Sequence, residues 1–152
     1  GGNDYATNIK GCIGISYQIG DELPVSTEPG EMVGPTMHAV ETDNDSLINQ
    51  DPKAYWDPSL NNGRGGVAGS AYATSPRIVA IPLVNPDMMV QANNNGRTTV
   101  PISNIAGFFV EGYDNKTKSV VGRLVTMPGL VATGASPIGG PSAFLQTVVL
   151  VR

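Results

Sequence analysis

Apolar and polar residues alternate along the second half of the chain, from residue 75 onward, with the period of two that is typical of β-strands. Two turn signals interrupt this alternation. Residues 93–96 read Asn-Asn-Asn-Gly and residues 114–117 read Asp-Asn-Lys-Thr, so both predict the turn of an antiparallel hairpin. Pro82 cannot donate a ladder hydrogen bond, which predicts an edge position or a bulge for its strand. The predicted strands are residues 77–84, 88–92, 98–102, 105–113, 118–127 and 144–151.

The first third of the chain has a different pattern, in which apolar residues recur at helical spacing. We predict one helix or two short helices over residues 35–50, because Pro35 suits a first helical turn and Pro52 ends the helix. The apolar stripe consists of Met37, Val40, Leu47 and Ile48. Residues 3–10 predict a short helix or an irregular lead-in, and the alternation over 13–17 predicts a strand that ends at Gly20-Asp21.

Two long segments between these elements are rich in glycine, proline and polar residues. Residues 20–36 predict an ordered loop, because their acidic and hydroxyl side chains can bind the loop's own backbone amides. Residues 57–74 predict a second loop with a flexible centre at 61–66. The whole pattern predicts an α+β fold that is mainly antiparallel, sandwich-like or barrel-like, with one or two helices in the N-terminal third.

Composition and charge indicate the number of domains, the cellular location and the classes of partner that are compatible with this fold. A length of 152 residues fits one domain, which we place at residues 3–152 because Gly1 and Gly2 resemble a cloning remnant. Charged residues form only 14% of a chain that holds 19 glycines and 12 prolines, a composition common among extracytoplasmic β proteins. The net charge of −4, with basic residues scattered singly, argues against nucleic acid or an anionic membrane as partner. The lone Cys12 is either a small buried hydrophobe or a bridge to a segment outside this chain.

Carboxylates are the candidate metal ligands. Asp43 and Asp45 alternate like the first ligands of an EF-hand loop, but Leu47 takes the next ligand position, so a solvated acidic helix face is the simpler interpretation. A second acidic group lies in loop 20–36 and consists of Asp21, Glu22, Glu28 and Glu31. These side chains are candidate calcium ligands or, more simply, turn and cap residues. His38 is the only histidine, which excludes a multi-histidine metal centre, and it is expected to be a partly exposed helix residue.

Aromatic side chains are scarce, and Tyr55 with Trp56 is the only place where they concentrate. The pair could stack on a sugar beside the loop carboxylates, or it could cover the edge of the sheet. A Trp56 ring fully enclosed by the core would remove the basis for the sugar platform. A carboxylate pair for glycoside hydrolysis cannot be identified from sequence, because the separation that it needs is spatial.

Three segments carry a family resemblance: residues 20–36, Gln50 to Asp57 with the sequence QDPKAYWD, and 75–87. Three later segments, 105–113, 121–125 and 144–152, extend it over most of the chain. The chain resembles the extracytoplasmic region of Flp/Tad pilus-assembly proteins of the TadE/TadG-like type. This resemblance implies an envelope-anchored component with protein partners in the pilus machinery, no cofactor and no catalytic residues. The alanine-rich anchor of that family is absent from this sequence, so contact with a membrane would need that anchor.

These observations predict a non-enzymatic, extracytoplasmic structural or interaction module associated with pilus assembly or the cell surface. The alternative is a module that binds carbohydrate, with or without calcium, and a carboxylate-based hydrolase is a third possibility. If the module assembles with itself, we expect it to use a strand edge, at Pro82 or along residues 144–151.

Overall fold

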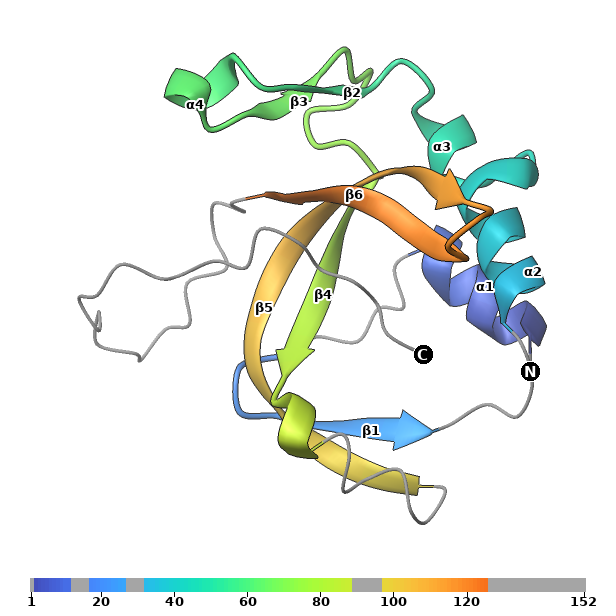
Figure 1. Ribbon diagram of the computed structural model, residues 1–152, viewed down its shortest axis with the longest axis vertical. Coiled ribbons are helices and arrows are strands. Elements are labelled where there is room, and N and C mark those ends of the chain that lie inside the picture. Colours follow the sequence, from blue (N-terminus) through green and yellow to red (C-terminus); the bar gives the residue numbers. More distant parts are fainter. Residues whose placement is uncertain (1, 12–16, 27–31, 89–96, 126–152) are drawn as a thin grey trace.

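The computed structural model describes residues 2–11, 17–26, 32–88 and 97–125 (Figure 1). One long strand, β5 (Arg97–Asp114), organises the main sheet and bends along its length (Figure 1). Three strands pair with β5, all of them antiparallel: β1 (Glu22–Ser26), β4 (Ile78–Val84) and β6 (Ser119–Val125). The predicted α+β class with antiparallel sheets is therefore confirmed. The described strands do not close on themselves, so the barrel-like alternative was wrong.

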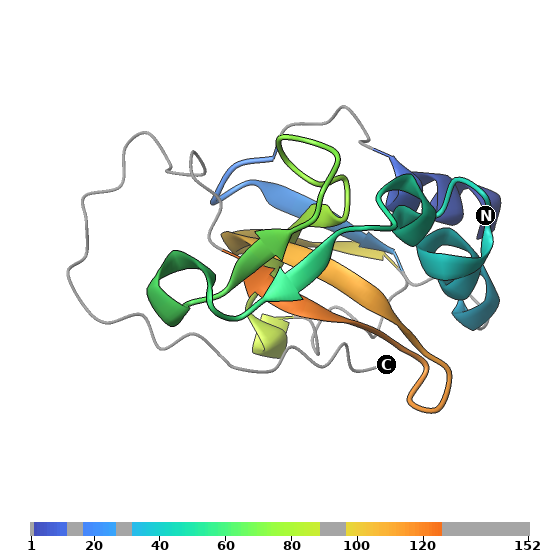
Figure 2. The same cartoon turned by 90° about the horizontal axis from the view of Figure 1, so that it is seen from above.

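A separate two-stranded sheet consists of β2 (Tyr55–Asp57) and β3 (Gly66–Ala68). This hairpin, called the β2–β3 hairpin below, lies across one side of the main sheet (Figure 2). The sequence predicted only a loop over residues 57–74. Its Asn61-Asn62-Gly63 turn adopts positive φ at all three residues, followed by Gly65 with φ +82°, and this left-handed backbone returns the chain into β3. The short element α4 (Leu60–Gly63) is part of this turn.

The other helices gather beside the end of the sheet where β5 turns into β6 (Figure 1, Figure 2). They are α1 (Gly2–Lys10), α2 (Val33–Met37), the π-helical turn η1 (His38–Thr42) and α3 (Leu47–Gln50). The hydrophobic core lies between these helices and the sheet, where Val40 and Leu47 pack with Val110 and Tyr113. A polar contact also links η1 to the sheet: Glu41 Oε1 accepts a hydrogen bond of 2.7 Å from the Tyr113 amide of β5.

The predicted helical region is confirmed, but it is divided into three short pieces. Pro35 sits in the first turn of α2, where its missing N–H has no intrahelical acceptor to lose. In η1 the helix changes to π-helical hydrogen bonding, in which the Asp43 amide donates to the His38 carbonyl five residues earlier, at 3.0 Å. Ser46 then caps α3 by accepting a 3.3 Å bond from the Asn49 amide. The helix predicted as one option for residues 3–10 is also confirmed, as α1.

Strand predictions were best for the hairpin of β5 and β6, whose turn was predicted at 114–117 and lies at 115–118. Two predicted strands, 98–102 and 105–113, are one continuous strand, so the break between them was wrong. Bulges between Leu83 and Val84 and between Val110 and Gly112 let neighbouring strands follow its bend. Pro82 lies in β4, which pairs with β5 alone among the described strands, so its predicted edge position is confirmed.

Two further predictions need correction. Residues 22–26 of the expected loop form β1, because pairing with the distant segment 97–101 supplies backbone partners that local sequence does not reveal. Met88, predicted to open a strand, lies in a helical turn. The predicted strand over 13–17, the turn at 93–96 and the strand over 144–151 lie wholly or mainly outside the described residues.

Candidate functional site

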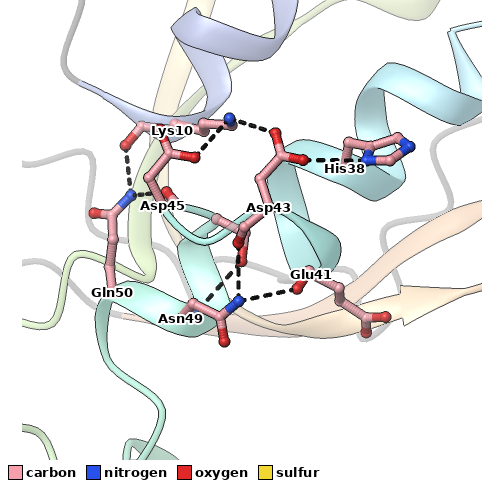
Figure 3. Close-up of polar contacts among 8 residues, drawn as sticks. Lys10, His38, Glu41, Asp43, Asp45, Asn49 and Gln50 are labelled. Carbon is pink, nitrogen blue, oxygen red and sulfur yellow. Dashed lines mark hydrogen bonds and ion pairs between the residues drawn. The ribbon is translucent and has the colours of Figure 1, made fainter.

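Lys10, the last residue of α1, lies at the centre of a charged cluster with His38, Asp43 and Asp45 (Figure 3). We call these four residues the Lys10 cluster. The Lys10 Nζ donates to Asp43 Oδ2 at 2.5 Å and to Asp45 Oδ1 at 2.7 Å. His38 Nδ1 lies 3.1 Å from the other oxygen of Asp43, and its ring is half exposed as predicted. The hydrogen bond from Lys10 lowers the pKa of Asp43, and the bonds to Asp43 and Asp45 raise the pKa of Lys10.

Two amide side chains hold this cluster in place. Asn49 Nδ2 donates to the carbonyl of Asp43 at 2.8 Å, and Gln50 Nε2 donates to the carbonyls of Asp45 and Lys10 at 2.8 and 2.9 Å (Figure 3). The two aspartates that the sequence proposed as calcium ligands thus converge, and the cation that they bind here is the ammonium of Lys10. No group of three or more His, Cys, Asp or Glu side chains in the described residues is arranged to hold a metal ion.

The Lys10 cluster should make docking of α1 sensitive to pH. The lowered pKa of Asp43 stabilises the folded state above the unfolded value of about 3.9, and this contribution disappears as the pH falls through the folded pKa. The raised pKa of Lys10 stabilises the folded state below about 10.4 and loses its effect as the pH rises through the folded value. We expect Lys10→Met to flatten both limbs of stability against pH, measured by urea unfolding between about pH 3 and 11.

Lys116 offers the matched control for this experiment, because it is an exposed lysine in the β5–β6 turn. Lys116→Met should leave both pH limbs unchanged. Equal pH profiles for wild type and Lys10→Met would show that the cluster does not couple α1 docking to pH.

Asp21 and Glu22, the two described carboxylates of the predicted calcium group in segment 20–36, form no hydrogen bond or ion pair with the Lys10 cluster. Asp21 and Glu22 are exposed, and Asp21 Oδ2 accepts a 2.8 Å bond from the Gln18 amide, which is the turn role that the sequence also allowed. At the end of this turn the Gly20 amide donates to the Ile102 carbonyl of β5, and the Asp21 carbonyl accepts from the Ile102 amide. Glu28 and Glu31 lie outside the described residues, so the four-carboxylate calcium site stays a prediction.

Tyr55 and Trp56 are consecutive residues of β2 and therefore point to opposite faces of the hairpin. Tyr55 is 56% exposed, whereas Trp56 is half-buried with its ring centroid 6.4 Å from that of Phe109. Gly65 packs against the indole so closely that a Cβ there would lie 2.3 Å from Trp56 Cζ2. Trp56 therefore anchors the β2–β3 hairpin to the main sheet, and it does not form one aromatic platform with Tyr55.

Asp51 lies at the base of the hairpin with only 1% of its surface exposed. Its carboxylate accepts hydrogen bonds from Ser70 Oγ at 2.6 Å, Ser75 Oγ at 2.7 Å and the Ala71 amide at 3.2 Å. Burial opposes ionisation of Asp51, but these bonds outweigh it, and the net effect is a lowered pKa. This charged, fully bonded carboxylate fixes the segment 70–75 that connects the hairpin to β4.

Arg77 is the second buried charge of this region and is only 5% exposed. Its guanidinium donates to four main-chain carbonyls: Val110 at 2.9 Å, Ala54 at 2.6 Å, Asp51 at 3.2 Å and Glu111 at 3.4 Å. It also lies 4.7 Å above the centre of the Phe109 ring. Burial lowers the pKa of Arg77, and the negative charge of Asp51 acts against this shift.

A groove of about 720 Å³ lies between the β2–β3 hairpin and the adjoining ends of β4 and β6. Its lining includes Trp56, Asn61, Arg64, Tyr72 and Leu124. Tyr72 is 54% exposed and offers an open aromatic face, while Asn61 is held by a bond to the Gly65 carbonyl. We call this space the hairpin groove. It contains the mixture of one cation, amides and aromatic rings that can bind a polar ligand with flat apolar faces.

The outer edges of the main sheet are the second feature with a capacity for binding. β1, β4 and β6 each pair with β5 and with no other described strand. Backbone N–H and C=O groups on the outer side of such a strand can pair with an added strand, a frequent mode of protein recognition, although β1 and β4 each contain a proline, which lacks the N–H donor.

No protein-family model, curated protein or solved structure matches this chain. The helices of the described residues include none that is long and apolar enough to cross a membrane.

Asp43, Asp45, Tyr55 and Trp56 stand out in the sequence, whereas Lys10 and Arg77, which bond to distant parts of the chain, do not. Lys10 bonds a partner 33 residues away, and Arg77 reaches carbonyls between 23 and 34 residues away. Single basic residues in a chain with few charges were the only signal available. A buried arginine cannot be told from an exposed one by its position in such a sequence.

Proposed function

We propose that this chain is a non-enzymatic structural and interaction module of the cell envelope, associated with pilus assembly. Its location and pilus association rest on the resemblance of six sequence segments to TadE/TadG-like proteins. The interaction role rests on the sheet edges. Asp43, Asp51 and Arg77 have side chains of the types that enzymes use, but here they are engaged in bonds that hold helices, hairpin and sheet together, which supports a structural role.

The observation that carries the proposal is the arrangement of three flanking strands around β5, with no described strand on their outer sides. A sheet edge binds partners through main-chain hydrogen bonds, so it requires no cofactor and no catalytic group. Charged side chains that commonly protect such edges are few here, since β4 has none and β6 has only Arg123.

Photo-cross-linking in native envelopes tests this role. A photoreactive phenylalanine derivative would replace Val121 on β6 or Ala80 on β4, both of which are exposed. We expect adducts with envelope or pilus proteins, identified by mass spectrometry, from at least one edge position. The same derivative at Lys53, an exposed residue outside the strands, is the control and should give none.

Two results would overturn the proposal. One is the absence of adducts from both edges in envelopes that contain the full-length protein. The other is turnover of a glycan, peptide or ester that disappears when His38 or one of the carboxylates is replaced.

The hairpin groove favours a second candidate function, the binding of carbohydrate. An exposed aromatic face stacks on the apolar face of a sugar, and Tyr72 supplies such a face beside Arg64 and Asn61. Tyr72→Ala should then abolish binding to a glycan array. Tyr55→Ala is the matched control, because Tyr55 is equally exposed but does not line this groove. An array without any bound glycan would contradict this candidate.

A further inference from the structure

We propose that the outer edge of β6 pairs antiparallel with the same edge of a second copy of this chain, joining two four-stranded sheets into one. The inference rests on the proposed interaction role and names a partner for it. In Figure 2, β6 lies at the border of the sheet, and its turn with β5 projects away from the body. Among the described strands only β5 pairs with β6.

Proline distinguishes β6 from the other two edges. β1 contains Pro24 and β4 contains Pro82, whereas β6, with the sequence SVVGRLV, contains none. The direction of the Pro82 nitrogen follows from the bond between the Val110 amide and the Arg77 carbonyl. Bonding residues alternate along an antiparallel strand, so positions 79, 81 and 83 face β5 and position 82 faces outward. The outer edge of β4 therefore lacks a donor where an added strand would need one.

The same alternation identifies the outward groups of β6. Since Val110 bonds toward β4, Phe109 and Gly107 bond toward β6, where their partners are Arg123 and Val125. The Tyr113 amide bonds to Glu41, so beyond the bulge it is Gly112 that faces β6, opposite Val121. Inward positions of β6 are thus odd-numbered throughout. The N–H and C=O groups that face outward belong to Val120, Gly122 and Leu124.

These outward groups define a self-complementary register centred on Gly122. In a two-fold arrangement Gly122 faces Gly122 of the second copy, and Val120 faces Leu124 of the second copy, an apolar pair. On the other face of the sheet Val121, which is 44% exposed, lies opposite Arg123 of the second copy. Arg123 is already paired with Glu111 of its own chain at 3.1 Å, so no uncompensated like charges stand directly opposite each other.

Cysteine pairing tests this register directly, in full-length chains that all carry Cys12→Ser. Positions 121 and 123 of two copies form a non-hydrogen-bonded pair, whose Cα separation of about 4.5 Å is within the range of a disulfide. A mixture of Val121→Cys and Arg123→Cys chains should therefore cross-link rapidly under mild oxidation. Either chain alone should cross-link at least about tenfold more slowly. Ala80→Cys on β4 is the control and should not cross-link with either.

Charge substitution provides an independent measurement in the same register. Val121→Lys places a second positive charge opposite Arg123 of the other copy, and it should weaken dimerisation about tenfold in analytical ultracentrifugation. Val121→Glu places a complementary charge there and should leave the dimer intact or strengthen it. A chain that is monomeric at all concentrations and gives no mixed cross-link overturns the inference. Residues 144–151 or a different partner would then be the occupant of this edge, and envelope adducts from Val121 would still support the proposed function.

Discussion

Replacing Arg77 with methionine is expected to lower the free energy of unfolding by about 3–5 kcal/mol, which is the usual cost of breaking a buried charged network on one side. Methionine fills part of the volume but donates no hydrogen bond. Four main-chain carbonyls that Arg77 now satisfies would be left without their donor, and the charge on buried Asp51 would lose its nearby compensation. Domains of ordinary stability unfold at about 5–15 kcal/mol, so the loss would be a large fraction of the total.

Urea unfolding followed by fluorescence measures this loss, because Trp56 is the only tryptophan and lies 6.4 Å from the Phe109 ring that Arg77 covers. Arg123→Met is the matched control. Its side chain is 57% exposed and pairs with Glu111 across the strand, so removing it should cost about 1 kcal/mol or less. Equal losses for the two substitutions would show that burial gives Arg77 no special weight.

The parts of the fold that were predictable from sequence are those in which neighbouring residues carry the signal. The hairpin of β5 and β6 follows from alternation on both sides of a polar turn, and the helical region follows from apolar spacing around Val40 and Leu47. β1 was missed because a proline-containing segment becomes a strand only through its partner at 97–101. The β2–β3 hairpin was missed because its Asn-Asn-Gly turn was interpreted as flexible, although asparagine and glycine are the residues that tolerate positive φ.

The candidate sites were less predictable, because charge and burial are properties of contacts between distant residues. Asp43 and Asp45 were weighed as calcium ligands or as a solvated acidic helix face, and in the fold both carboxylates bond Lys10. Their alternation could not indicate that Lys10, 33 residues earlier, would provide the cation. Likewise, the pair Tyr55-Trp56 suggested one aromatic surface. Both residues lie in β2, where successive side chains point to opposite faces, so the two rings are separated. The sequence pattern indicates which residue types could form a site, whereas the tertiary fold determines which of those residues are in contact.

Replacing Gly65 with alanine is expected to cost about 2–5 kcal/mol and to detach the β2–β3 hairpin from the main sheet. Two effects add in this estimate. An alanine at φ +82° carries the penalty of the left-handed region, about 1–2 kcal/mol, and its Cβ would overlap Trp56 Cζ2 at 2.3 Å, which adds the cost of overpacking, about 1–3 kcal/mol. The indole would have to move to make room, which disturbs its packing on Phe109. We therefore expect a red shift of the Trp56 emission in the folded state, together with a lower urea midpoint.

Gly63 separates these two effects within the same turn. Its φ of +80° is nearly identical, but a Cβ at Gly63 would meet no atom within 4 Å. Gly63→Ala should therefore show the backbone penalty alone, about 1–2 kcal/mol, with unchanged Trp56 emission. The difference between the two variants measures the contact between Gly65 and the indole. If Gly65→Ala matches Gly63→Ala in both stability and emission, that contact does not hold the hairpin, and the anchoring role of Trp56 would have to be abandoned.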